Sequence, residues 1–219
     1  MSLSISNIRK CFKAPGGREV VAVEGASLSL APGELCAIHG PSGSGKTTLL
    51  LMAGALLSPD SGSVSVRGAN PYTLGAVGRA RLRAEGIGFV FQQFHLLPYL
   101  NVLENSMIPV LAGGVEGAEE RARELLGRFG LGHRILHTPG ALSVGERRRV
   151  ALARALLRAP PILIADELTG DLDKENAAAI MAYVVDFASG GGTVLMATHD
   201  ESVMRVAGRR LEMREGRLA

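Results

Sequence analysis

The sequence predicts an α/β fold built on a mostly parallel sheet, and three observations carry this prediction. Short apolar segments typical of buried strands alternate with segments of helical periodicity along most of the chain. A glycine-rich stretch, residues 40–48, lies between one such strand and the helix that follows it. Strand patterns fade from about residue 93 to residue 140, so we expect a helical insertion into the α/β domain.

The N-terminal third consists mainly of expected strands. Apolar residues recur from Leu3 to Ile8, and alternating polarity marks residues 27–30. The pair Pro32 and Gly33 is typical of a hairpin turn. The expected elements before residue 70 are strands at 3–8, 20–23, 27–30, 35–38 and 63–66, and a helix at 48–53.

The remaining chain alternates helices with apolar strands. Residues 119–129 and 146–157 carry apolar side chains at helical spacing, and Pro160 and Pro161 end the second of these helices. The expected elements are helices at 79–85, 119–129, 146–157 and 174–188, and strands at 87–91, 162–165, 193–197, 210–213 and 216–218.

Residues 40–48 match the phosphate-binding pattern G-x-x-x-x-G-K-[ST]. Glycines let the backbone bend tightly and turn its N–H groups toward an anion, and the next helix presents its positive end to the same anion. We expect Lys46 to contact the β- and γ-phosphates and the Thr47 hydroxyl to bind Mg²⁺. The nucleotide-binding residues expected here are Gly40, Pro41, Ser42, Gly43, Ser44, Gly45, Lys46, Thr47 and Thr48.

Two carboxylates follow the apolar run at 162–165. A strand end would place Asp166 and Glu167 at the sheet edge near the phosphate-binding loop. Asp166 could then hold Mg²⁺ through water, and Glu167 could polarise an attacking water. Taken alone, the pair could also be two solvated acids at the end of a strand.

The composition sets further bounds. The 219 residues are 47% hydrophobic, which is ample for the core of one domain. A net charge of +3 and the absence of Trp give little support to a nucleic-acid partner. Cys11 and Cys36 form no disulfide framework, so we expect a reducing, cytosolic compartment. Neither a signal segment nor an apolar run near the roughly 20 residues of a membrane span is visible.

Residues 142–146 read Leu-Ser-Val-Gly-Glu and precede a strongly helical segment. This stretch resembles the signature motif of ATP-binding cassette (ABC) ATPases, usually LSGGQ or LSGGE. The resemblance implies that Ser143 and Gly145, at a helix start, contact the γ-phosphate of ATP bound to a second copy. Ser143 and Glu146 also have the spacing of a capping box, and both interpretations can hold together.

Further family motifs follow in order over nearly the whole chain. Phe12 matches the aromatic residue that stacks on adenine, although it could instead belong to the core. Gln92 matches the glutamine that binds Mg²⁺ and senses the membrane partner. Asp173 falls in the D-loop motif, and His199 matches the switch histidine that contacts the γ-phosphate. The resemblance thus implies Glu167, His199 and Lys46 as catalytic residues, and Thr47, Gln92 and Asp166 around Mg²⁺.

The resemblance also implies an architecture and partners. It implies a RecA-like P-loop NTPase core with an antiparallel β subdomain. Residues 1–219 would form one cassette, and residues from about 93 to 150 would form an inserted helical subdomain. Two copies would sandwich two ATP molecules and drive an integral membrane permease from the inner face of the membrane. Within the family, the chain resembles the branch that contains the ATPases of lipoprotein release, macrolide export and cell division. The residues that carry this resemblance are 82–83, 87–98, 103–105 and 211–218.

Several positions depart from the family pattern. Val144 replaces the first signature glycine, and Leu168 replaces the usual proline after Glu167. Asp171 stands where this branch often has Asn, and Arg147 and Arg148 replace common glutamines, adding positive charge beside the nucleotide interface. These departures leave open a degenerate cassette that does not hydrolyse ATP, although an active ATPase is our expectation.

Two other functions share parts of this motif pattern, and two residue clusters lie outside it. An adaptor ATPase of a cell-division or signalling complex would carry the same motifs, whereas a soluble cassette of translation or DNA repair usually has two cassettes or a long coiled coil. His133 and His137 have helical spacing for a metal but lack a third ligand. The arginines at 147–149, 154 and 158 are expected to form mostly a solvated or interface face rather than a nucleic-acid patch.

Overall fold

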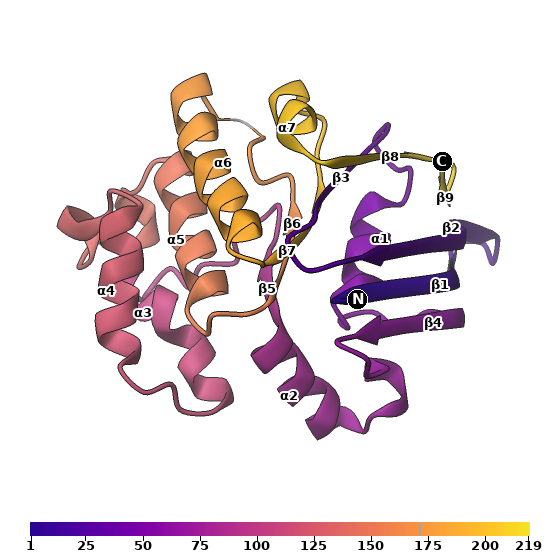
Figure 1. The fold of residues 1–219 in the computed structure, drawn as a ribbon, viewed down its shortest axis with the longest axis horizontal. Helices are drawn as coiled ribbons and strands as arrows, with labels where there is room; N and C mark the ends of the chain where they lie inside the picture. Colours follow the sequence, from indigo (N-terminus) through magenta and orange to yellow (C-terminus); the bar gives the residue numbers. More distant parts are fainter. Residues whose placement is uncertain (171) are drawn as a thin grey trace.

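The computed structural model describes residues 1–170 and 172–219, so Asp171 lies outside the described residues. It contains two sheets and helices packed around them (Figure 1). The larger sheet has the order β5-β6-β7-β3-β8-β9, in which β5 through β8 pair in parallel and β9 pairs antiparallel with β8. Its strands are β3 (Leu35–His39), β5 (Ile87–Val90), β6 (Ile162–Asp166), β7 (Thr193–Ala197), β8 (Arg209–Arg214) and β9 (Arg217–Leu218).

The smaller sheet is antiparallel and has the order β2-β1-β4. Its strands are β1 (Leu3–Lys13), β2 (Glu19–Leu30) and β4 (Ser61–Val66). Helix α1 (Lys46–Ala53) contacts β1 and β2 of this sheet and β6 and β7 of the larger one. It is therefore held between the two sheets, and Figure 1 shows α1 in that position.

The central strands of the larger sheet are buried on both faces. In β6, Ile162 and Ile164 belong to the apolar cluster shared with α1 and the small sheet, while Leu163 and Ala165 belong to the cluster shared with the helices. This alternation follows from the two-residue period of a strand, and it explains why the segment is continuously apolar. The predicted α/β fold with a mostly parallel sheet is confirmed.

The remaining helices lie mostly on the other side of the larger sheet, on the left of Figure 1. They are α2 (Ala76–Gly86), α3 (Val102–Met107), α4 (Ala118–Arg128), α5 (Val144–Leu156), α6 (Lys174–Ser189) and α7 (Glu201–Val206), with short 3₁₀ turns between some of them. Within the described ranges, no helix combines the length and the apolar character needed to cross a membrane.

Some sequence-based expectations about the elements were wrong. The strands expected at 20–23 and 27–30 are one strand, β2, which passes through Gly25 at a φ of 66° with an irregular register against β1. Pro32 and Gly33 do not close a hairpin, because β2 and β3 lie in different sheets. The turn instead carries the chain from one sheet to the other, and its own sequence cannot show which strands will pair.

Candidate functional site

The carboxyl ends of four neighbouring parallel strands bring the predicted residues to one edge of the sheet. The phosphate-binding loop follows β3, His199 follows β7, Asp166 ends β6, and Gln92 follows β5. Because these strands are adjacent in the order β5-β6-β7-β3, their ends form one row. Such an edge is the usual ligand-binding position of open parallel sheets.

Two glycines of the phosphate-binding loop are clamped by distant backbone. A Cβ added at Gly40, where φ is 151°, would lie 2.0 Å from the Met213 carbonyl oxygen of β8. A Cβ at Gly45, where φ is 105°, would lie 2.1 Å from the Ala22 carbonyl oxygen of β2. Glycine is therefore required here by backbone packing as well as by access for an anion.

Lys46 and Ser44 carry hydrogen-bond donors that suit phosphate oxygens. The Lys46 ammonium donates to the carbonyl oxygens of Gly40 and Pro41 at 2.7 and 3.0 Å, so it lies folded back over the loop. The Ser44 side chain is buried, and its hydroxyl has no hydrogen-bond partner in the part of the chain that the structure describes. A hydroxyl and an ammonium beside the positive start of a helix form a donor set that matches phosphate oxygens.

Thr47 and Asp166 form the pair expected to bind magnesium. The Thr47 hydroxyl donates to Asp166 Oδ2 at 2.7 Å, which joins α1 to the end of β6. Burial raises the pKa of the Asp166 carboxyl, because the charged form is poorly solvated there. A hydroxyl beside a buried carboxylate is a set of hard oxygen ligands that fits Mg²⁺, which takes few protein ligands and keeps water or phosphate for the rest.

Glu167 and His199 face each other across two strand ends. Glu167 Oε2 lies 2.8 Å from His199 Nδ1, as a short contact rather than an aligned hydrogen bond. Glu167 has a φ of 52°, which is uncommon for a residue with a side chain, and its N–H donates to the Ala197 carbonyl at 3.0 Å. The carboxylate is mostly buried while the imidazole is exposed.

The capping box predicted at residues 143–146 is confirmed. The Ser143 hydroxyl accepts from the Glu146 N–H at 3.1 Å, and Glu146 Oε2 accepts from the Ser143 N–H at 2.7 Å. That second hydrogen bond is the main reason that the pKa of the Glu146 carboxyl is lowered. Contact of Ser143 and Gly145 with ATP of a second copy stays a prediction.

Asp173 serves as the N-cap of α6 within its own chain. Its Oδ1 accepts from the Asn176 N–H at 2.8 Å, and its Oδ2 accepts from the Asn176 amide at 2.6 Å. The same segment approaches the signature motif, since a Cβ added at Gly145 would lie 3.3 Å from Leu172 Cδ2. Leu172 therefore packs against the start of α5, next to the Ser143 cap.

Phe12 is not a core residue. It lies on β1 opposite Val20 and is 43% exposed, which removes the core alternative. Its ring has Lys10 Nζ 5.8 Å from its centroid. Gln92 is also exposed, two residues beyond the end of β5. Both side chains are free to meet a ligand, and their roles stay predictions.

Replacing Phe12 by Ala should weaken ATP binding by about 1–2 kcal/mol, because the base would lose its stacking surface. Equilibrium titration of a fluorescent ATP analogue measures this change. Val77→Ala is the matched control, since Val77 is 84% exposed on α2 and far along the chain. Equal ATP affinity in the wild type and Phe12→Ala would exclude Phe12 from the site.

The departures from the family pattern fit the structure without backbone strain. Val144 is the first residue of α5, has no positive φ and is 39% exposed, so its side chain needs no glycine conformation. Leu168 is fully buried in the core against the helices.

The arginines after the signature motif were expected to form mostly a solvated or interface face, and Arg148 departs from this because it is buried. Arg148 is 3% exposed, and the Arg154 guanidinium donates to the carbonyl oxygens of Phe94 and His95 at 2.6 and 2.8 Å. Arg158 donates to the Gly113 carbonyl oxygen at 2.6 Å. Contacts with segments distant in sequence bury Arg148 and partly cover Arg154 and Arg158, which periodicity along one helix cannot reveal.

No metal site forms from the histidines at 133 and 137. Residues 1–170 and 172–219 contain no group of three or more His, Cys, Asp or Glu side chains arranged to hold a metal ion. His133 lies in a short 3₁₀ turn, and His137 follows it in the loop before α5. The residues therefore lack the continuous helix that would put them on one face.

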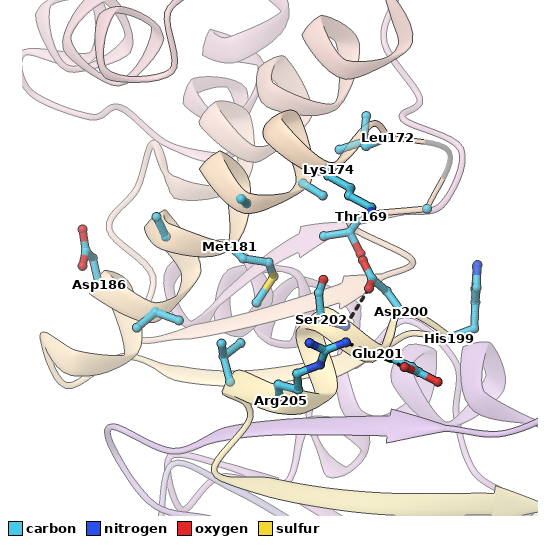
Figure 2. Close-up of a pocket in the computed structure, with 16 residues that line it drawn as sticks. Thr169, Leu172, Lys174, Met181, Asp186, His199, Asp200, Glu201, Ser202 and Arg205 are labelled. Carbon is cyan, nitrogen blue, oxygen red and sulfur yellow. Dashed lines mark hydrogen bonds and ion pairs between the residues drawn. The ribbon is translucent and has the colours of Figure 1, made fainter.

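A groove next to His199 was missed by sequence analysis. Figure 2 shows it between α6 and α7, with Met181 pointing into it and His199 at one end. Asp200 is the N-cap of helix α7, and its Oδ1 accepts from the Ser202 N–H at 2.8 Å. An Asp followed by a short polar-apolar segment is the signal that could have predicted this helix.

Comparisons with known proteins place these observations in a family. The family model described as ABC transporter matches residues 23–170. The chain is 45% identical to the lipoprotein-releasing system ATP-binding protein LolD 1 of Rhodopirellula baltica, over 99% of this chain and 95% of the relative. It is 44% identical to the macrolide export ATP-binding/permease protein MacB of Chlorobium luteolum, over 92% of this chain but only 30% of that longer protein.

A solved structure shares the fold along almost the whole chain. It is described as a dimeric, post-hydrolysis state of the ATP-binding cassette MJ0796 bound to ADP and Pi. The two chains superpose with a TM-score of 0.93 at 35% identity, covering 99% of this chain and 96% of the other. The resemblance seen in the sequence motifs is confirmed: the chain belongs to the ABC transporter family.

Proposed function

We propose that this chain is the ATP-binding and ATP-hydrolysing subunit of a transporter, and that it powers a separate membrane permease of the lipoprotein-release or macrolide-export type. The LolD 1 relative supports this assignment over nearly the whole length of both chains, and the MacB relative over the 30% of its length that this chain matches. The observation that carries it is the row of strand ends that joins the phosphate-binding loop to Asp166, Glu167 and His199.

The proposed chemistry is attack of water on the γ-phosphate of ATP, which forms a new P–O bond and breaks the bond from the γ-phosphorus to the bridging oxygen, so that ADP leaves. Lys46 leaves the carbonyl oxygens it contacts and neutralises charge on the β- and γ-phosphates. Glu167 accepts a proton from the attacking water, and its buried carboxylate is shielded from bulk solvent. His199 is exposed at the neighbouring strand end, where it can hold the γ-phosphate region.

Thr47, Asp166 and Gln92 are the residues that would hold Mg²⁺. The hydrogen bond between Thr47 and Asp166 already brings two oxygen ligands together at the start of α1. Bound there, the ion would neutralise charge that develops on the phosphate oxygens. Gln92, exposed beyond β5, would complete the set when the nucleotide is bound.

The active form is proposed to be a dimer with two ATP molecules between the copies. One chain carries one phosphate-binding loop and one signature motif, so a second copy would supply Ser143 and Gly145 across each nucleotide. Asp173, in the segment that packs beside the signature motif in its own chain, would also contact the nucleotide site. The dimeric state of the similar MJ0796 cassette, bound to ADP and Pi, supports this arrangement.

We propose that residues 1–219 form one cassette with a helical subdomain at about 93–150. The chain would act in the cytoplasm, attached to the inner face of the membrane through its permease. A degenerate cassette is disfavoured, because Val144 starts a regular helix and Leu168 fills the core. The following experiment distinguishes a transporter subunit from an adaptor ATPase of a cell-division or signalling complex.

Isolation of the tagged chain from membranes of its native host, in mild detergent and with ATP, tests the partner. We expect an integral membrane permease to co-purify and to increase the ATPase rate of the chain. The Thr47→Ala variant is the matched control for nucleotide dependence. Co-purification of a cell-division complex without transport of a substrate in reconstituted vesicles would contradict the transport function.

A further inference from the structure

Helix α5 carries a buried arginine, Arg148, that contacts two segments outside the helix. Arg148 is only 3% exposed. Its guanidinium donates through Nη1 to the Gly170 carbonyl oxygen and lies 5.1 Å from the centroid of the Phe94 ring. Burial of a guanidinium is costly unless polar and aromatic partners surround it, so these contacts hold the side chain in one place.

The Gly170 contact reaches the turn that contains Glu167. The Gly170 N–H donates to the Glu167 carbonyl oxygen at 3.3 Å, which closes the turn. A Cβ added at Gly170 would lie 3.8 Å from Glu167 Oε2, so this glycine packs over the carboxylate itself. Glu167 has a strained φ of 52°, and such a conformation persists only where several contacts enforce it.

The Phe94 contact reaches the segment that follows Gln92. Phe94 lies two residues beyond Gln92, and its ring packs partly buried against the helical core. Arg154, further along α5, donates to the carbonyl oxygens of Phe94 and His95 at 2.6 and 2.8 Å. The segment after Gln92 is thus fastened to the same helix as the turn after Glu167.

We propose that Arg148 is a positioning residue that holds the Glu167 carboxylate in its reactive place and links it to the segment after Gln92. The inference rests on the proposed role of Glu167. A neutral glutamine at position 148 has neither a forked cation for the Gly170 carbonyl nor the charge that is attracted to the Phe94 ring. Because Arg148 contacts both Phe94 and Gly170, movement of Phe94 changes the position of the turn that contains Glu167, and with it the rate of hydrolysis.

The test compares Arg148→Met and Arg148→Lys in the full chain with a control on the same side of the molecule. Arg148→Met should lower kcat about tenfold with KM for MgATP changed less than about twofold, because loss of the charged hydrogen bond to the Gly170 carbonyl affects the reacting group and not ATP binding. Arg148→Lys keeps a donor and should recover part of kcat. Arg158→Met, which removes hydrogen bonds to the carbonyl oxygens of Pro109 and Gly113, should keep both constants.

A double-mutant cycle with Phe94→Leu tests the link. If Arg148 acts through both contacts, the double variant should lose less kcat than the product of the two single losses. Multiplicative losses would overturn the link to Phe94. Wild-type kcat in Arg148→Met, or a loss in kcat, KM and thermal stability that Arg158→Met shares, would overturn the positioning role.

Two further measurements keep the result interpretable. If Arg148→Met yields no folded protein, Arg148→Gln is measured instead, with a smaller loss of kcat at unchanged KM expected. Glu167→Gln is measured in parallel. An inactive Glu167→Gln with a wild-type Arg148→Met refutes the positioning role alone, whereas an active Glu167→Gln refutes the proposed role of Glu167.

Discussion

Glu167→Gln should reduce ATP turnover at least about 100-fold, because an amide cannot accept the proton of the attacking water. ATP binding should persist, since glutamine has nearly the same shape and Lys46, Thr47 and Asp166 are unchanged. Phosphate release under steady-state conditions measures turnover. Light scattering after gel filtration with ATP should show a stable dimer in the variant, because hydrolysis no longer reopens it.

Glu201→Gln is the matched control for this prediction. Glu201 lies two residues after His199, and its side chain is 90% exposed in the first turn of α7. The same chemical change there should leave turnover at the wild-type level. A Glu167→Gln variant that hydrolyses ATP as fast as the wild type would disprove the assignment of Glu167 as the base.

Gly45→Ala should destabilise the fold by about 3 kcal/mol and abolish ATP binding. The new methyl group would lie 2.1 Å from the Ala22 carbonyl oxygen and 2.9 Å from Met213 Cε, at a φ of 105°. Strain at positive φ and overpacking against backbone add to this cost. Thermal and chemical unfolding measure the stability, and nucleotide titration measures the binding.

Gly43→Ala separates the two causes within the same loop. Gly43 has a φ of 77°, and among the described residues other than its two chain neighbours no atom lies within 4 Å of a Cβ added there. Only the backbone strain applies, so we expect a loss of about 1 kcal/mol. Equal stability losses in the two variants would show that the contacts with Ala22 and Met213 do not clamp the loop.

Short-range patterns were sufficient for much of the molecule. The apolar run at 162–165 is a core strand because both faces of that strand are buried, and such burial leaves an unbroken apolar signal. The Ser143 capping box was predicted from two residues three positions apart, since its hydrogen bonds close within one helical turn. Residues 46–48 begin a helix after a glycine-rich loop, as the motif requires.

Pairing between segments far apart in the chain escaped those patterns. The Pro32–Gly33 turn has ordinary hairpin residues, but the strands on its two sides belong to different sheets. The arginines of α5 look like a charged surface in the sequence, yet Arg148 is buried by Gly170 and Phe94. A side chain is exposed or buried according to what packs against it, and its neighbours along the helix do not contain that information.

The chemical groups of the site, and the order in which they occur, follow from the residues alone, because phosphate, magnesium and water each require particular side chains. Their assembly is a property of the folded chain. The strand order β6-β7-β3 places Glu167 against His199 at the ends of two adjacent strands, and α1, which follows β3, brings Thr47 to Asp166. More than 30 residues separate the members of each pair. Met213 and Ala22 press on the loop only after β8 and β2 have packed beside it, so only the tertiary structure shows why Gly40 and Gly45 cannot carry a side chain.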